Sequence, residues 1–427
     1  MNSLNKEQKS GILFLLTSKT FESLAYYLVV AILLDFLCAS LKIELGKTGI
    51  YYTIWAGTYA ITAIIAAFLG DKFNRVQIVK IGFMLTTIFY LVLAFLPGIP
   101  FLIAAALVLL GVGIGMTMLN TRILLGNIYN EKGNEIRGLS GFILYGLAIN
   151  IGGLFAPQLA VFLKTEWGYN SVFLFAFILG LLSWILYLKF KSQYQKLELV
   201  AEQKENSETA DTQKLHRLIL FSILTIGVFI FFAVSQKEVS YQLSANNLLQ
   251  NGSHLSQELS RVGMFIAIVL TALFAYSVLS IKNWDWGKLF NLILIGVAFA
   301  VISSLFMITL TSLSPINGNS LYSIAYILIL IAETLIAPVI LYIVYRSSPL
   351  RHKGLFQGIF FLLGGLVNLL LYGGFYLSSE NAVLTFVLFG IILIIAAVLI
   401  LLLKKRVNDT VVEIEKDGEE VLVEGEV

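Results

Sequence analysis

The sequence contains twelve apolar runs that are each long enough to cross a bilayer as a helix, for which about 20 residues suffice. Hydrocarbon offers backbone groups no partner outside the chain, and no run alternates like a barrel strand. With 58% hydrophobic and 13% charged residues in 427, a water-soluble fold could not bury the apolar surface. The sequence therefore predicts an all-α membrane protein. Its twelve predicted spans are residues 11–38, 48–69, 77–96, 101–126, 138–163, 170–190, 215–236, 260–281, 287–310, 320–345, 354–378 and 381–403.

Basic residues are distributed unevenly over the connections between these spans. Most of the 29 lysine and arginine residues lie in the N-terminus, the even-numbered connections and the C-terminal tail. Those in the odd-numbered connections are Lys42, Lys47, Lys164, Lys237 and Arg261. With an even number of spans, the positive-inside rule predicts that both termini lie in the cytoplasm. We expect a multi-pass protein of the inner (plasma) membrane. No short apolar stretch with a cleavage site precedes the first span, so we expect the N-terminus to be retained.

One polar segment divides the chain into two halves of six spans. Residues 191–214 lack periodicity, which is typical of a solvated cytoplasmic linker, with a short surface helix as an alternative. We expect an N-terminal six-helix bundle over residues 1–190 and a C-terminal one over 215–404. Residues 405–427 are an acidic cytoplasmic tail that alternates apolar and polar residues around Asp417-Gly418. That pattern is compatible with a small hairpin and equally with a disordered tail.

The composition disfavours several classes of function. A formal net charge of +3 gives no reason to expect a nucleic-acid partner. Cys38 is the one cysteine, which excludes an internal disulfide. The three histidines, His216, His254 and His352, fall at span ends or in loops, so we expect no metal site inside the membrane. The sequence has no nucleophile–base set and no phosphate loop, so we expect neither an enzyme nor a cofactor.

The connection between the second and third spans reads Gly70-Asp71-Lys72-Phe73-Asn74-Arg75. An acid at a helix end with flanking cations can pair with a neighbouring helix and favour one closed state. The segment resembles the signature of the major facilitator superfamily. The resemblance implies the major facilitator fold, with two pseudo-symmetric six-helix bundles around a site at mid-membrane. We expect Gly70, Asp71 and Arg75 to take part in gating.

A more specific resemblance begins at Arg137. The segment Arg137–Pro157, followed by Trp167–Phe173, resembles the fifth-helix signature of the proton-dependent oligopeptide transporter family. Ala332–Pro338 resembles that family's tenth helix, Ser348–Gly354 the connection after it, and Leu125–Tyr129 the end of its fourth helix. The resemblance implies a divergent member that moves short peptides together with protons by alternating access.

The chain departs from this family at the residues that carry its chemistry. The first-helix motif Glu-x-x-Glu-Arg-Phe-x-Tyr-Tyr corresponds here to Lys19–Tyr27, in which one glutamate has become lysine and the arginine has become Ser23. The fourth-helix Lys-Pro-Asn is Met118-Leu119-Asn120, and the acid-Gln pair of the seventh helix is Ser235-Gln236. The residues that couple protons and bind peptide in this family are therefore only partly present in this chain.

Two charged residues lie inside the first predicted span. Lys19 and Glu22 are three residues apart and share one helical face, with Tyr26 one turn further on. A charge near the bilayer centre costs about 3 kcal/mol on insertion scales, so it normally faces a protein interior or water. One interpretation is an intrahelical ion pair that only makes insertion tolerable. The other is a cavity-lining site in which Glu22 exchanges the coupled proton and Lys19 contacts substrate.

Glu333 lies near the middle of the tenth span, with no cation within a turn. The cost of its charge must therefore be met across the cavity, by water or by substrate. In the family that the chain resembles, this position meets the amino terminus of the peptide and takes part in proton movement. We predict that Glu333 couples protons and binds substrate.

Arg122 follows Met118 by four residues, on the same helical face but one turn nearer the cytoplasm. Its planar guanidinium either takes over anion recognition from the lost lysine or extends to the cytoplasmic surface. The other candidate substrate contacts are Tyr26, Tyr27, Asn120, Tyr145, Asn150 and Gln236. Helix packing is the alternative for Asn150, and interhelical hydrogen bonding for the tyrosines. Pro157 and Pro338 are expected to kink their helices and to serve gating.

Together these features predict a proton-coupled secondary transporter of short peptides or peptide-like zwitterions that works by alternating access. One alternative is an exporter of amphipathic metabolites or drugs on the same fold. Another is a membrane receptor that binds ligand without transport. The expected partners are a small-molecule substrate, protons and the lipid bilayer, without nucleic acid, and the expected oligomeric state is a monomer.

Overall fold

The computed structural model describes residues 6–41, 45–96, 99–129, 138–204, 210–235, 252–280, 285–313, 318–364 and 381–424, and the regular structure in these ranges is helical. Ten of the described helices are long and apolar enough to cross a membrane, and two shorter apolar helices lie at Phe265–Val278 and Lys353–Gly364. Each predicted span coincides with one of these helices, although part of the span at 354–378 lies outside the described residues. The prediction of an all-α membrane protein is confirmed.

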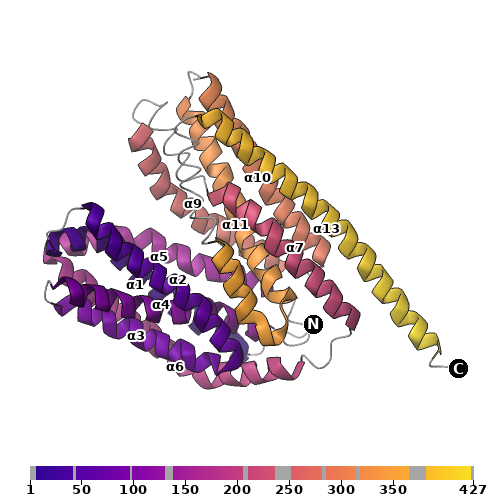
Figure 1. The fold of residues 1–427 in the computed structure, drawn as a ribbon, viewed down its shortest axis with the longest axis horizontal. Coiled ribbons are helices and arrows are strands. Elements are labelled where there is room, and N and C mark those ends of the chain that lie inside the picture. The colour runs from indigo at the N-terminus through magenta and orange to yellow at the C-terminus, as the bar shows by residue number, and fades with distance from the viewer. Residues whose placement is uncertain are drawn as a thin grey trace. The chain divides into compact units, whose positions relative to one another are not determined.

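The chain forms two compact units. Unit 1 consists of Met1–Gln203 together with Pro349–Leu362, a short segment from the second half of the sequence. Its long helices, coloured indigo to magenta in Figure 1, are α1 (Lys6–Leu41), α2 (Leu45–Lys72), α3 (Arg75–Phe95), α4 (Pro100–Ile128), α5 (Gly138–Trp167) and α6 (Tyr169–Lys204). Helix α4 packs against both α2 and α3, and α1 packs along α5. Helix α4 also contacts both α1 and α5, so these three helices lie next to one another inside unit 1.

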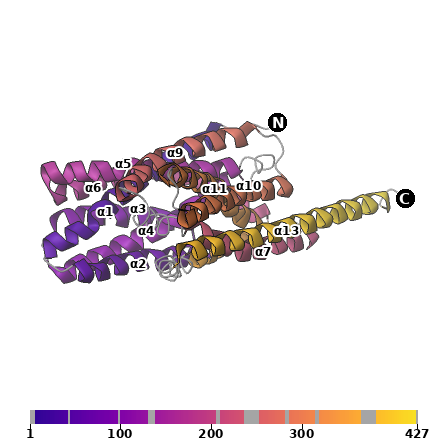
Figure 2. The ribbon, with the colours of Figure 1, turned by 90° about the horizontal axis from the view of Figure 1, so that it is seen from above.

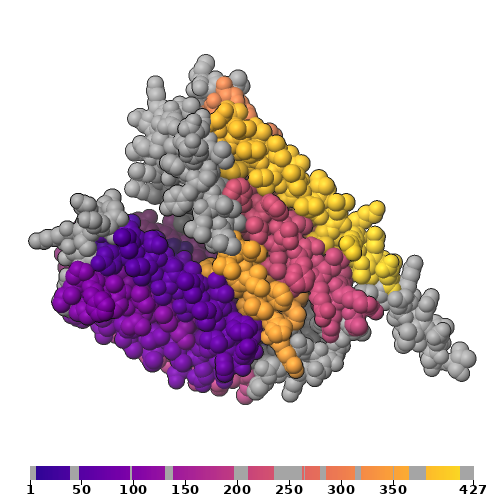
Figure 3. Space-filling view, in the orientation of Figure 1, coloured from indigo at the N-terminus to yellow at the C-terminus, as the bar shows by residue number. Residues whose placement is uncertain are grey.

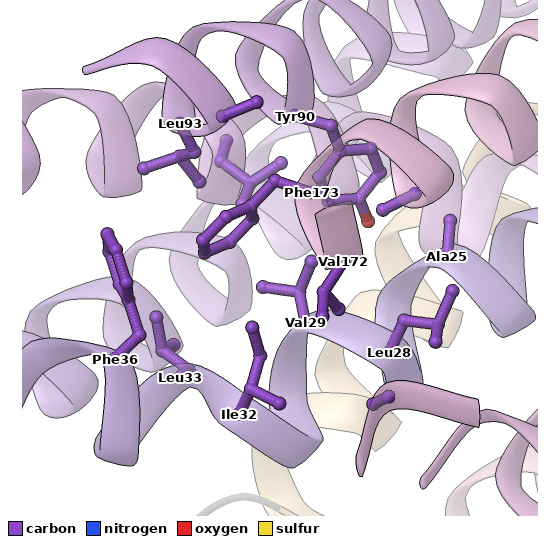
Figure 4. Packing of buried hydrophobic residues seen from close by; sticks show 14 of the residues in the cluster. Ala25, Leu28, Val29, Ile32, Leu33, Phe36, Tyr90, Leu93, Val172 and Phe173 are labelled. Atoms are coloured by element: carbon purple, nitrogen blue, oxygen red, sulfur yellow. The ribbon is translucent and has the colours of Figure 1, made fainter. Parts of the chain in front are cut away.

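An apolar core holds the helices of unit 1 together. Figure 4 shows Leu28 and Ile32 of α1 facing Tyr90 of α3 and Phe173 of α6, and all four side chains are buried. The rings of Phe36 and Phe173 meet edge to face, with centroids 4.8 Å apart. Lipid tails are as apolar as these side chains, so close packing rather than removal from water provides most of the attraction.

Helix α4 approaches α2 at a distance that only glycine permits. A Cβ atom on Gly115 would lie 2.7 Å from the carbonyl oxygen of Tyr59 and 2.7 Å from Cβ of Thr62. We expect Gly115→Val to lower the free energy of unfolding by about 1–3 kcal/mol, because the two backbones must separate. Thermal unfolding in detergent measures this. Gly57→Val is the matched control on α2, since nothing lies within 4 Å of its added Cβ, and an equal loss of stability in both variants would contradict the prediction.

Unit 2 consists of Lys204–Ser348 and Leu363–Val427. Its labelled helices are α7 (Ala210–Ser235), α9 (Gly252–Ser280), α10 (Trp286–Leu313), α11 (Gly318–Ser347) and α13 (Ala382–Glu424). Helix α10 packs against α11 and α13, and α7 packs against the same two helices. Figure 2 shows α7 and α13 side by side, and Figure 3 shows them adjacent on one face of this unit.

Helix continues into both segments that were expected to be irregular. Helix α6 extends to Lys204, well into the predicted linker at 191–214. Tyr194 supports the first part of this extension, because its buried ring stacks on Tyr187 and its hydroxyl donates to the carbonyl oxygen of Gly11 at 3.0 Å. The turn of α6 that carries Tyr194 is therefore attached to α1.

The C-terminal tail is helical as well. Helix α13 runs without a break from Ala382 to Glu424 and extends beyond the end of α7 in Figures 1 and 2. The hairpin and the disordered tail considered for this segment are therefore both wrong. An isolated two-stranded hairpin is at best marginally stable, whereas a tail that continues a membrane helix needs no new nucleus.

Candidate functional site

Lys19 and Glu22 form an ion pair inside unit 1. Nζ of Lys19 lies 2.9 Å from Oε2 of Glu22, and the two residues are only 8% and 5% exposed. The other carboxylate oxygen, Oε1, lies 2.5 Å from Oγ1 of Thr117 on α4. The pair predicted from the spacing is therefore present, and it is also joined to a second helix. Both carboxylate oxygens of Glu22 have partners in this arrangement.

Thr117 presents to Glu22 a hydroxyl that can either donate or accept a hydrogen bond. Its hydroxyl lies within hydrogen-bond distance of Glu22 and also 2.9 Å from the carbonyl oxygen of Ile114. A hydroxyl has one proton to donate and can also accept. An ionised Glu22 accepts from Thr117 and pairs with Lys19. A protonated Glu22 can donate to Thr117, which then donates to Ile114, and Lys19 then lacks its counter-ion.

Tyr145 of α5 brings two cations together. Nζ of Lys19 lies 5.5 Å from the centroid of its ring, and Cζ of Arg122 lies 5.4 Å from the same centroid. Its hydroxyl donates to the carbonyl oxygen of Met118 at 3.1 Å and is 2.8 Å from Oγ1 of Thr121. We call Lys19, Glu22, Thr117, Arg122 and Tyr145 the charge cluster. It joins α1, α4 and α5, and both cations can interact with the electron-rich ring.

Asn120 faces a different set of residues. Its Oδ1 accepts from Nη1 of Arg75 at 2.6 Å, and its Nδ2 donates to the carbonyl oxygens of Ala66 and Met116. The side chain is fully buried in these contacts. This arrangement favours a structural role for Asn120 over the substrate contact that we expected from the sequence.

Asp71 connects the turn between α2 and α3 to the helix Lys353–Gly364. Its carboxylate accepts from the backbone N–H groups of Gly354 and Leu355, both at 2.8 Å, and from Nη2 of Arg75 at 2.5 Å. The N-terminus of a helix presents unpaired N–H groups and a positive dipole, which suit a carboxylate. We call Asp71, Arg75, Asn120, Gly354 and Leu355 the latch. Gly70 belongs beside it, since a Cβ there would lie 2.6 Å from Oδ1 of Asn120.

Tyr26 and Tyr27 lie in an aromatic cluster between α1 and α2. The ring of Tyr26 stacks on Trp55, with centroids 5.7 Å apart, and lies 6.4 Å from Tyr59. Trp55 is almost fully buried, and its Nε1 has no hydrogen-bond partner among the described residues. Sequence reasoning missed Trp55, Tyr59 and Thr117, because a neutral side chain in an apolar span gives no signal of its own.

The remaining predicted residues of unit 1 do not belong to the charge cluster. Asn150 is half-buried on α5, and the nearby Gly152 packs against the backbone of Ser23, as expected for close helix packing. Pro157 and Pro338 lie inside α5 and α11. Glu333 is exposed on α11 of unit 2, and Gln236 lies outside the described residues. Within the described ranges, no group of three or more His, Cys, Asp or Glu side chains is placed to hold a metal ion.

Comparison with known proteins gives three kinds of match. A family model of the Major Facilitator Superfamily matches residues 15–372. The di-/tripeptide transporter of Lactococcus lactis subsp. cremoris is 23% identical over 283 residues, which are 63% of this chain and 54% of the relative. The chain thus spans about half the length of this relative.

Two solved structures share the fold over nearly the whole chain. The POT family transporter PepTSo matches with a TM-score of 0.60 and 14% identity, covering 93% of this chain and 98% of that one. The human organic anion transporter MFSD10 matches with a TM-score of 0.67 and 12% identity, covering 92% and 99%. The resemblance to peptide transporters stated from the sequence is confirmed, at the low identity expected of a divergent member.

Proposed function

The chain belongs to the major facilitator superfamily, and from this premise we propose that it is a proton-coupled secondary transporter of short peptides or peptide-like zwitterions, working by alternating access. It is a multi-pass membrane transporter, not an enzyme. The similarity to di-/tripeptide transporters supports the choice of solute. We place it in the inner (plasma) membrane, and we place both termini in the cytoplasm because basic residues gather in the even-numbered connections.

The observation that carries this proposal is the contact of Glu22 with Lys19 and Thr117. A buried carboxylate is costly unless it is paired or neutralised. Glu22 has a hydrogen-bond partner in either form, Lys19 and Thr117 when ionised and Thr117 when protonated, and its protonation frees the charge of Lys19 for a group of the solute. A group with two satisfied protonation states inside a membrane span is suited to take up a proton on one side and release it on the other.

The latch supplies the conformational part of the proposal. Its carboxylate, guanidinium and helix N-terminus form strong, charge-assisted hydrogen bonds that depend on one position of the helix Lys353–Gly364. Alternating access requires at least two states of similar free energy. We propose that the latch stabilises one of them and opens in the other.

Glu333 is the second proposed proton site, and its replacement tests the coupling. We expect Glu333→Gln to reduce uptake driven by an imposed pH gradient in proteoliposomes by about tenfold, because a neutral amide cannot carry the proton. Counterflow of labelled dipeptide, which needs no net proton movement, should continue. Glu413→Gln, a change at an exposed position of α13, is the control. If the Glu333→Gln variant keeps full uptake driven by the pH gradient, Glu333 does not take part in proton coupling.

A further inference from the structure

The charge cluster carries more positive than negative charge. Lys19 and Arg122 bring two cations to the ring of Tyr145. Among the described residues, Glu22 is the carboxylate bonded within the cluster, and its Oε2 is already 2.9 Å from Nζ of Lys19. Lys19 and Glu22 balance each other when both are ionised. Among the described residues, no carboxylate then balances the charge of Arg122 on α4.

Arg122 also has an unused hydrogen-bond donor. Its Nε is buried and has no hydrogen-bond partner, and none of the carboxylates that the structure describes forms an ion pair with its guanidinium. A buried donor without an acceptor is unfavourable. The hydroxyl of Tyr145 does not fill this place, because it is bonded to Thr121 and to the carbonyl oxygen of Met118. The ring face offers a cation–π contact but no acceptor for the N–H groups.

We propose that Arg122, with Lys19 beside it, binds an anionic group of the transported solute, and that the preferred solute carries a net negative charge. This inference rests on the proposed function, since it names the charge class of the solute at the same site. A planar guanidinium presents parallel N–H groups to a carboxylate, and the neighbouring ammonium adds a second cation. The inference thereby narrows the proposed function, because among short peptides and peptide-like solutes the site favours those with a free carboxylate and a blocked amine over the zwitterions named above.

A matched series of dipeptides tests the charge preference on the unmodified protein. N-acetyl-Ala-Ala carries one negative charge, Ala-Ala is a zwitterion and Ala-Ala amide carries one positive charge. We expect the acetylated form to inhibit uptake, and to raise the melting temperature, at concentrations about tenfold lower than Ala-Ala, and we expect no effect of the amide. Equal potency of the three compounds, or a preference for the zwitterion, would overturn the inference.

Two substitutions assign the preference to Arg122. Arg122→Gln should remove the preference for the acetylated dipeptide over Ala-Ala. Arg122→Lys should keep part of this preference, since lysine has the positive charge but lacks the paired N–H donors of the guanidinium. Lys189→Gln is the control, because Lys189 also lies over an aromatic ring, that of Phe14 at 5.0 Å, but outside the charge cluster. If folded Arg122→Gln protein keeps the preference for the acetylated dipeptide, the anionic group binds elsewhere and the role proposed for Arg122 is wrong.

A second pair of probes separates this inference from the proposed function. Hexanoate and hexylamine have similar apolar chains and opposite charges, and neither is a peptide. If the dipeptides are not transported, the proposed function fails. Stabilisation by hexanoate alone, lost in Arg122→Gln, would still support the anion site. Equal stabilisation by both probes would contradict it.

Discussion

Asp71→Asn is expected to lower the free energy of unfolding by about 3 kcal/mol and to reduce uptake by about tenfold. The side chains of Asp71 and Arg75 are only 2% and 4% exposed, so the substitution removes the negative charge beside a buried guanidinium, which keeps its hydrogen bond to Asn120. Removing one member of a buried pair typically costs about 3–5 kcal/mol. The amide also weakens the hydrogen bonds to the N–H groups of Gly354 and Leu355, which shifts the balance between transport states.

Asp35→Asn provides a matched control for this experiment. Asp35 also pairs with a cation, Lys164, but both side chains are substantially exposed, at 52% and 33%. Exposed ion pairs contribute about 0–1 kcal/mol. Thermal unfolding of both variants in detergent, combined with initial rates of uptake in proteoliposomes, measures the difference. Equal losses in the two variants would show that burial of the Asp71 pair is not what makes it important.

Gly354→Ala tests the latch without removing any charge. An added Cβ would overlap the carbonyl oxygen of Ala67, so the start of the helix Lys353–Gly364 must move away from Asp71. We expect the loss of uptake seen in Asp71→Asn, and little further loss when the two changes are combined, because they break the same contact. Gly358→Ala is the control, since its Cβ would meet Ile64 at an ordinary 3.4 Å. Fully additive effects would contradict a shared contact.

The sequence predicted the spans because each is a long local signal. It also predicted that Lys19 and Glu22 share a helical face, since that depends only on a spacing of three residues. The partner of Glu22 on α4 was missed, because Thr117 lies 95 residues away and the register between two helices is set by packing over their whole length. Interhelical contacts of neutral residues therefore remain hidden until the fold is known.

Two further differences have the same origin. Asn120 was grouped with the substrate contacts by its place in a motif, and that motif gave no sign of its hydrogen bond to Arg75; the substrate contact stays a prediction. The tail was assigned from a local alternation of apolar and polar residues, whereas the helix begun at Ala382 continues through it. In both cases the neighbouring structure outweighs the local pattern.

Glu22→Gln is expected to abolish proton-driven accumulation and to destabilise the protein. The substitution removes the coupled proton site and leaves Lys19, only 8% exposed, without its counter-ion. Lys19→Met leaves Glu22 unpaired and should destabilise to a similar degree. Each single change is expected to cost about 3 kcal/mol or more, because an uncompensated charge remains in a buried position.

The double variant separates stability from coupling. Lys19→Met with Glu22→Gln removes both charges, so we expect it to recover most of the lost melting temperature, since a buried pair often contributes little net stability. Accumulation driven by a pH gradient should still be absent, while counterflow of labelled solute persists. Glu166→Gln, at an exposed position on α5, is the control for loss of a carboxylate in unit 1. If the double variant accumulates solute against a gradient as the unmodified protein does, Lys19 and Glu22 serve only to make the first helix tolerable in the membrane, and the proton must travel by another route.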